Sequence, residues 1–318
     1  MNYLCASFFA GVGGIDLAFE NKGFSVIYAN EIDSYATKTY ETNFNVKVDN
    51  RDIRDVKTDE IPDFDIMLAG FPCQAFSIAG YRQGFNDEKG RGNLFFELER
   101  IFKIKKPNII FLENVKNLVS HDNGNTFNII LEKLKKEGYY VKYKVLNAMN
   151  YGNIPQNRER IYIIAFKNKN HYYKFEFPNP VILTNKLRDI IDFELKVNSD
   201  FYYTPEKYSI YDILAESIKK TDTIYQWRRK YVRENKNNVC PTLTANMGTG
   251  GHNVPLILSK HGIRKLTPVE CFKIQGFPED FKISERLSNT KAYMQAGNSV
   301  VVPVVERIVD KISEVLNQ

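Results

Sequence analysis

The chain has 318 residues, 43% of them hydrophobic, which is enough for one large core and a smaller appended domain. It holds no run of 18 apolar residues and no basic leader followed by an apolar stretch, so composition argues against membrane and secretory proteins and favours the cytoplasm. The net charge of +6 is modest and does not by itself indicate a nucleic-acid ligand.

Short apolar strands alternate with helical stretches over about the first 165 residues, which predicts a doubly wound, Rossmann-like α/β fold. Strands are expected at 4–9, 24–29, 66–69, 108–112 and 161–166, and helices at 15–21, 94–102 and 126–137. From about residue 170 to 260 the pattern is irregular and predicts a smaller second domain. Residues 303–316 predict a terminal helix that packs back on the first domain.

The first expected strand runs into the glycine turn Ala10-Gly11-Val12-Gly13-Gly14, where a nucleotide-like ligand can approach the backbone. The second strand ends at Glu31, an acid placed to bond ribose hydroxyls. A dinucleotide-binding turn favours Gly or Ala where this chain has Asp16, and that carboxylate would repel a pyrophosphate. A nucleoside cofactor without phosphates fits better, and S-adenosylmethionine is the common one.

A cysteine follows the apolar run 66–69, in the loop Gly70-Phe71-Pro72-Cys73-Gln74. The carboxyl edge of a sheet is where open α/β folds place ligands, so a nucleophile is well placed there. The alternative is that Cys73 is a small buried hydrophobe. The four cysteines, at positions 5, 73, 240 and 271, have no C-x-x-C spacing, so we expect no metal site and no disulfide framework.

These segments and several later ones together resemble the bacterial DNA (cytosine-5)-methyltransferases of restriction-modification systems. Besides the glycine turn and the cysteine loop, the matching blocks are Glu113-Asn114-Val115, Gln156-Asn157-Arg158-Glu159-Arg160, residues 264–270 with Gln275-Gly276-Phe277-Pro278, and Gly297-Asn298-Ser299-Val300. They run in family order from residue 9 to residue 300.

The resemblance implies an S-adenosylmethionine site that begins at the glycine turn, with Glu31 on the ribose and Asp52 and Ile53 on the adenine. The residues expected to bind the cofactor are Phe9, Gly11, Gly13, Gly14, Glu31, Ile32, Asp52, Ile53, Gly70, Pro72, Leu94, Asn298, Ser299 and Val300. A plain turn or cap acid is the alternative for Asp52.

The chemistry of cytosine methylation suggests roles for five residues. Carbon C5 is a weak nucleophile until a thiolate adds at C6, so Cys73 is the expected nucleophile and Glu113 the expected proton donor to N3. Asn114 would fix that carboxylate, Arg160 would contact O2, and Arg158 would support it. The alternatives are a helix-start acid for Glu113 and a surface ion-pair cluster with Glu159 for the arginines.

Attack at C6 requires a base flipped out of the duplex, and residues 77–92, polar and with four glycines, could close over it. Ala79 stands where some relatives have a small hydroxyl residue, so the residue that fills the vacated space stays open.

Sequence recognition is expected in the second domain. Residues 226–236 carry five basic side chains, the only Trp and a Tyr, a pattern that can bind phosphates and stack bases, or form a solvated basic face. The glycine-rich loop 242–253 has short polar side chains that can reach base edges, or is an ordinary flexible surface loop. The residues expected to contact DNA are Ser77, Arg228, Arg229, Arg233, Thr242, Thr244, Gly248, Gly250 and Gly251.

The predicted organisation is a catalytic domain at 1–170 and 291–318, a target-recognition domain at 171–262 and a connecting region at 263–290. We expect a monomer that acts on double-stranded DNA beside a restriction endonuclease for the same site. One alternative is a tRNA methyltransferase, but the Cys-Phe-Thr signature of that branch is absent from the variable region. The other, a non-catalytic DNA-binding relative, predicts loss of the thiol, the acid or the glycines, and all are present.

Overall fold

A computed structural model describes residues 3–72, 94–235, 237–249, 254–285 and 287–317. The chain divides into two compact units, one formed by residues 1–146, 159–178 and 305–318, and the other by residues 147–158 and 179–304. No helix among the described residues is long and apolar enough to cross a membrane.

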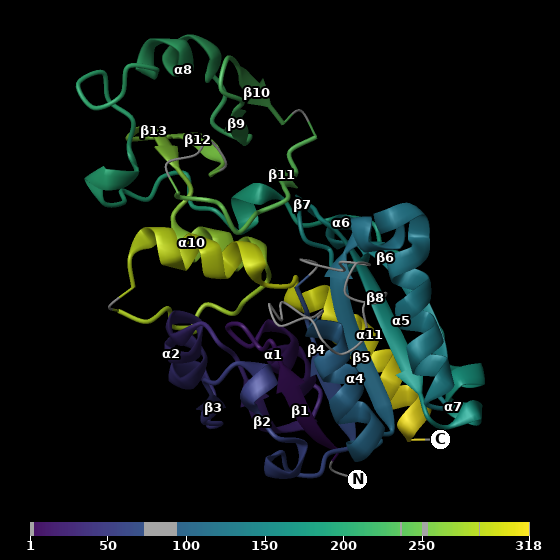
Figure 1. Cartoon of the computed structure of the whole chain (residues 1–318). Helices are drawn as coiled ribbons and strands as arrows, with labels where there is room; N and C mark the ends of the chain where they lie inside the picture. Colours follow the sequence, from purple (N-terminus) through teal and green to yellow (C-terminus); the bar gives the residue numbers. More distant parts are fainter. Residues whose placement is uncertain (1–2, 73–93, 236, 250–253, 286, 318) are drawn as a thin grey trace. The chain divides into compact units, whose positions relative to one another are not determined.

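The first unit is built on a seven-stranded sheet with the order β3-β2-β1-β4-β5-β8-β6 (Figure 1). The strands from β3 to β5 pair in parallel, whereas β5 and β8 pair antiparallel. The bounds are β1 Leu4–Phe8, β2 Ser25–Asn30, β3 Val48–Asp49, β4 Ile66–Ala69, β5 Ile109–Val115, β6 Tyr140–Asn147 and β8 Glu159–Phe166.

Among the described residues, the helices of this unit are α1 Gly14–Glu20, α2 Ser34–Asn43, α4 Leu94–Lys105, α5 Asn125–Lys136, α7 Lys169–Lys174 and α11 Val302–Leu316. Short 3₁₀ turns occur at η1 Ile53–Asp55, η2 Thr58–Glu60, η3 Lys116–Val119 and η4 His121–Gly124. Helix α11 is tied to α1 by a hydrogen bond from Asn21 to Glu306 (2.7 Å) and an ion pair between Lys22 and Asp310 (2.8 Å). The prediction that the terminal helix returns to the first unit is therefore confirmed.

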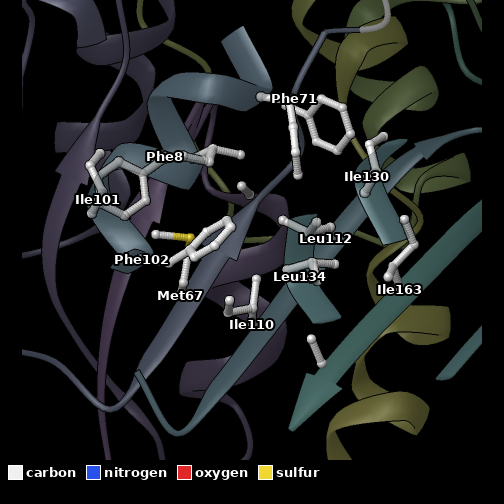
Figure 2. Packing of buried hydrophobic residues seen from close by; sticks show 14 of the residues in the cluster. Phe8, Met67, Phe71, Ile101, Phe102, Ile110, Leu112, Ile130, Leu134 and Ile163 are labelled. Carbon is white, nitrogen blue, oxygen red and sulfur yellow. The ribbon is translucent and has the colours of Figure 1, made fainter. Parts of the chain in front are cut away.

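Alternate residues of a strand point to opposite faces of the sheet. A parallel sheet that is covered by helices on both faces therefore needs apolar side chains on both. One face forms a large apolar cluster with α4 and α5; Figure 2 shows Phe102 of α4 close to Met67 of β4 and Ile110 of β5. On the other face Phe19 of α1 packs edge-on against Phe111 of β5, with ring centres 5.4 Å apart. This accounts for the unbroken apolar run 66–69, whose four residues are all buried.

The position of β1 between β2 and β4 creates the switch point of the sheet. The chain leaves β1 toward α1 and β2 on one side, and β4 lies on the other, so the segments after β1 and β4 start at neighbouring strand ends. Ligands of open α/β sheets bind at such a switch point. The glycine turn follows β1 and the Gly70-Phe71-Pro72 segment follows β4, which brings the two predicted motifs to the same edge.

The second unit has a four-stranded sheet with the order β10-β9-β12-β13 and a parallel pair, β7 with β11. Its strands are β7 Gln156–Asn157, β9 Tyr225–Trp227, β10 Val232–Glu234, β11 Cys240–Pro241, β12 Leu256–Ser259 and β13 Gly262–Lys265. Its helices are α6 Ala148–Tyr151, α8 Tyr211–Ser217, α9 Pro268–Ile274 and α10 Asn289–Asn298, with 3₁₀ turns η5 Leu187–Asp189 and η6 Ser199–Phe201. Helix α9 starts with a capping box between Thr267 and Glu270.

Candidate active site

The turn after β1 adopts a backbone that favours glycine. Gly11 and Gly13 have φ values of 57° and 85°, and even Phe9 is left-handed at 54°. A side chain at Gly13 would collide with the ring of Phe44, because an added Cβ would lie 2.3 Å from it. The glycines expected from sequence are thus required by the geometry of the turn, and Gly14 begins α1.

Glu31, directly after β2, is hydrogen-bonded to this turn. Its carboxylate accepts the Gly11 amide (2.9 Å) and the Asp33 amide (2.8 Å). Burial raises the pKa of Glu31, while these amide bonds act to lower it. The neighbouring Ile32 is 60% exposed. A hydrogen-bonding acid beside an exposed apolar side chain suits a ligand with one polar and one apolar part.

Asp52 and Ile53, the expected adenine pair, occupy different environments. The Asp52 carboxylate caps η1 through the Arg54 amide (3.0 Å) and also accepts Arg54 Nε (2.9 Å). Arg54 lowers the pKa of Asp52. Ile53 is buried in the main apolar cluster at 3% exposure. The structure thus gives Asp52 the capping contact of the alternative interpretation, and a role in adenine binding stays a prediction.

Asp16 lies inside the first unit beneath the turn, with no exposed surface. It accepts a hydrogen bond from Ser7 Oγ (2.6 Å), and burial raises its pKa to about 7. A buried carboxyl that is partly protonated near neutral pH is a weak source of repulsion for a bound phosphate. This weakens the sequence argument that Asp16 disfavours a pyrophosphate by charge, and the preference for a cofactor without phosphates stays a prediction.

The segment before the expected nucleophile is fixed by β5. Asn114 Nδ2 donates to the Phe71 carbonyl (2.8 Å), and a Cβ added at Gly70 would lie 3.6 Å from Glu113 Oε2. Asn114 thus fixes the main chain two residues before Cys73, whereas the sequence suggested that it fixes the Glu113 carboxylate. Pro72 is exposed, and Cys73 and Ser77 lie outside the described residues, which resume at Leu94, the first residue of α4.

Glu113 and Arg160 come together on neighbouring strands. In the antiparallel pair Val115 lies opposite Arg160, and Arg160 Nε is 3.2 Å from Glu113 Oε1. Both side chains are mostly buried, at 11% exposed for Glu113 and 15% for Arg160. Glu113 lies within β5 and not after the strand, so neither the expected position nor the alternative of a helix-start acid fits. The Glu159 carboxylate pairs instead with Lys116 (2.9 Å).

Arg158 makes its hydrogen bonds to main-chain carbonyls in a different part of the chain. It is 2% exposed and donates to the carbonyls of Leu243 (2.6 Å), Gly297 (3.1 Å) and Ser299 (2.5 Å), all within the second unit. These contacts give Arg158 a structural position, and the supporting role in catalysis expected from sequence stays a prediction. Of the expected cofactor residues near it, Asn298 is exposed, and Ser299 and Val300 are buried.

The basic segment forms a hairpin in the second unit. Arg228 and Arg229 are exposed in the turn between β9 and β10, and Arg233 is exposed on β10. Trp227 is only 5% exposed and belongs to the unit's apolar cluster, so the expectation that it stacks on bases is wrong. Tyr231, at 58% exposure, is the accessible aromatic ring of this hairpin.

The loop after β11 is held at several points. Thr242 Oγ1 donates to the Asn157 carbonyl (2.6 Å), Met247 is fully buried, and Thr290 Oγ1 donates to the Gly248 carbonyl (2.9 Å). Thr244 is exposed, and its hydroxyl bonds the side chain of Asn246 (2.6 Å). These anchors argue against a freely flexible loop. Gly250 and Gly251 lie outside the described residues.

Three of the four cysteines can be excluded as nucleophiles. Cys5, Cys240 and Cys271 are buried thiols, and burial raises the pKa of each. A nucleophilic cysteine needs a lowered pKa and access to its substrate. Cys73 is therefore the remaining candidate.

The described residues form an α/β fold with a switch point beside β1, and comparisons with solved structures find the same fold. The chain shares its fold with DNMT2 of Spodoptera frugiperda (TM-score 0.76, 21% identity, 98% of this chain and 100% of that chain). A putative DNA modification methyltransferase from an E. coli prophage is also similar in fold (TM-score 0.69, 22% identity, all of both chains).

The sequence comparisons are more specific. Residues 3–314 match the model of the C-5 cytosine-specific DNA methylase family, and the chain belongs to that family. It is 61% identical over 308 residues to the Type II methyltransferase M.Bsp6I of Bacillus sp. (strain RFL6), covering 96% of this chain and 97% of that protein. It is 41% identical over 315 residues to the Type II methyltransferase M.HaeII of Haemophilus aegyptius, covering 99% and 94%.

Proposed function

We propose that the chain methylates C5 of a cytosine in a short duplex DNA site, with S-adenosylmethionine as methyl donor and Cys73 as nucleophile. The observation that carries the proposal is the Glu113–Arg160 pair beside Phe71, whose carbonyl is held by Asn114 two residues before Cys73. Three separate motifs thereby meet at one edge of one sheet. Membership of the cytosine-specific DNA family argues against tRNA as the substrate.

The residues supply the charges that thiol addition needs. When the Cys73 thiolate bonds to C6 of the flipped base, negative charge moves into the ring toward N3 and O2. Glu113, in its protonated form, donates a proton to N3, and the Arg160 guanidinium stabilises charge at O2. After C5 has accepted the methyl group, water as base removes the C5 proton, the C5–C6 double bond reforms, the Cys73 thiolate leaves, and N3 returns its proton to Glu113.

The first unit has features that fit S-adenosylmethionine, which supplies an electrophilic methyl group on a sulfonium. Glu31 already orders the glycine turn and keeps acceptor capacity for ribose hydroxyls, because the Gly11 and Asp33 amides each bond a different carboxylate oxygen and each oxygen has a second lone pair. Ile32 offers apolar surface beside it. The resemblance also implies that the cofactor contacts Asn298, Ser299 and Val300, and we include these contacts in the proposal.

We further propose that target recognition lies at 171–262, catalysis at 1–170 and 291–318, and the connection at 263–290. One chain then carries both catalytic and recognition segments, so a monomer suffices for one site. The relatives are named Type II methyltransferases, which supports a restriction endonuclease as partner and a cytoplasmic location beside the DNA.

The decisive experiment offers plasmid DNA and tRNA to the purified chain with radiolabelled S-adenosylmethionine, and then maps the modified cytosines by bisulfite sequencing. We expect label in DNA alone, at one recurring short word. Label in tRNA and not in DNA would overturn the proposed substrate.

A further inference from the structure

Three buried polar side chains of the second unit have no part in the chemistry above: Gln156, Arg158 and Gln275. They are 0%, 2% and 0% exposed. Burying such groups is costly unless their hydrogen bonds are made. Their partners therefore indicate what they do, and we call the three residues the buried bridge.

Arg158 joins two segments that are far apart in sequence. On one side its guanidinium donates to the Leu243 carbonyl (2.6 Å), in residues 242–249, the recognition loop. On the other side it donates to the carbonyls of Gly297 (3.1 Å) and Ser299 (2.5 Å), in residues 296–300, the α10 terminus. One rigid planar group thus fixes the main chain of both segments.

The two glutamines form a second connection beside it. The Leu243 amide donates to Gln156 Oε1 (3.3 Å), and Gln156 Nε2 donates to Gln275 Oε1 (2.9 Å). Gln275 Nε2 then donates to the Ala296 carbonyl (2.7 Å). The second connection also runs from the recognition loop to the α10 terminus.

The two segments also touch directly. A Cβ added at Gly297 would lie 2.2 Å from the carbonyl carbon and oxygen of Thr244 and 2.6 Å from the Ala245 nitrogen. Only glycine allows this approach, because the obstacle is main chain and cannot rotate away. A shift of either segment must therefore move the other or break buried hydrogen bonds.

We propose that the buried bridge couples target-DNA binding to cofactor binding, with Gln156, Arg158 and Gln275 as positioning residues. This rests on the proposed function, in which the recognition loop reads DNA and the α10 terminus contacts S-adenosylmethionine. A ligand that orders one segment also orders the other through the buried bridge. The second ligand then binds a segment that is already ordered. Linkage requires the same factor in both directions.

The test measures the dissociation constant of S-adenosylhomocysteine with and without a duplex carrying the word mapped by bisulfite sequencing. We expect the duplex to tighten wild-type binding about 5- to 150-fold, the usual range of coupling between sites. Arg158→Lys has no planar fork to bond the carbonyls of both segments at once, and it and Gln275→Met should each reduce that factor at least about fivefold.

Arg264→Lys is the matched control. Arg264 is also fully buried in the second unit, but its guanidinium bonds Glu270 (2.7 Å) and the Asp192 carbonyl (3.3 Å). It should lower stability and leave the coupling factor unchanged. An unchanged factor in folded Arg158→Lys and Gln275→Met, or a wild-type factor near 1, would overturn the proposal.

Hydrogen exchange of the wild type covers the case in which both variants fail to fold. S-adenosylhomocysteine alone should slow exchange in residues 242–249, and unchanged exchange there would also refute the coupling. If the wild type binds no S-adenosylhomocysteine at all, the proposed function itself fails. If it binds and methylates DNA without coupling, only the role of the buried bridge is lost.

Discussion

Replacement of Glu31 by alanine should weaken cofactor binding without affecting DNA specificity. The carboxylate accepts the amides of Gly11 and Asp33, and its remaining acceptor positions are those proposed for the ribose hydroxyls. Losing hydrogen bonds to a charged partner costs about 1 to 3 kcal/mol, which corresponds to a rise in dissociation constant of about 5- to 150-fold. Calorimetry with S-adenosylhomocysteine measures this dissociation constant in the wild type and in Glu31→Ala.

The same variant also frees the glycine turn, so the ribose contact needs its own measurement. A cofactor analogue without ribose hydroxyls should bind the wild type more weakly than S-adenosylhomocysteine, and this difference should nearly vanish in Glu31→Ala. Asp33→Ala is the matched control, because Asp33 caps α2 through the Tyr35 amide (2.9 Å). It should cost about 1 kcal/mol of stability and leave cofactor affinity intact. Equal losses for both ligands in Glu31→Ala would refute the ribose assignment.

Three further predictions follow from the same structure. Glu113→Gln should lower kcat by about 10²- to 10⁴-fold, measured by methyl transfer at saturating DNA and cofactor, because the amide cannot donate the N3 proton as an acid; a near-normal kcat would contradict that role. Burial raises the pKa of Asp16 from 3.8 to about 7, so the folded state binds this proton more tightly than the unfolded state and stability should fall as the pH rises from about 4 to 7. The difference is at most about 4 kcal/mol, and denaturant titrations of Asp16→Asn should lack this fall; a parallel fall in both proteins would show that another group causes it. Arg229→Gln should weaken binding to all duplexes alike and reduce the slope of log affinity against log salt by about 0.9 if the side chain contacts a phosphate, whereas loss confined to one base position would make it a base contact.

The parts of the fold that depend on neighbouring residues in the sequence were predictable. The glycine turn, the strand at 66–69 and the helix at 126–137 depend on backbone freedom, apolar runs and lysines near a helix end, and each is present in the structure. The position of Glu113 near Gly70 was also predictable, because neighbouring parallel strands place their carboxyl-terminal ends at one edge of the sheet.

The partners of single side chains could not be predicted in this way. Arg158 and Arg160 are two residues apart, yet one bonds carbonyls 85, 139 and 141 residues away and the other pairs with Glu113. Trp227 sits in a basic segment, but its strand turns it into an apolar cluster. Periodicity in a three-residue strand is too short to reveal the buried face. The residues around Gln156 in the sequence likewise form no pattern that predicts its burial or its partners.

The most direct test of the account uses a duplex in which the mapped target cytosine is replaced by 5-fluorocytosine. Fluorine cannot leave C5 as a proton does, so the wild type, given S-adenosylmethionine, should remain covalently attached to the DNA through Cys73. Peptide mapping by mass spectrometry locates the attachment, and Cys73→Ala should form no adduct and transfer no methyl group while still binding DNA and cofactor. Methyl transfer by Cys73→Ala, or an active wild type that forms no adduct, would contradict the central claim.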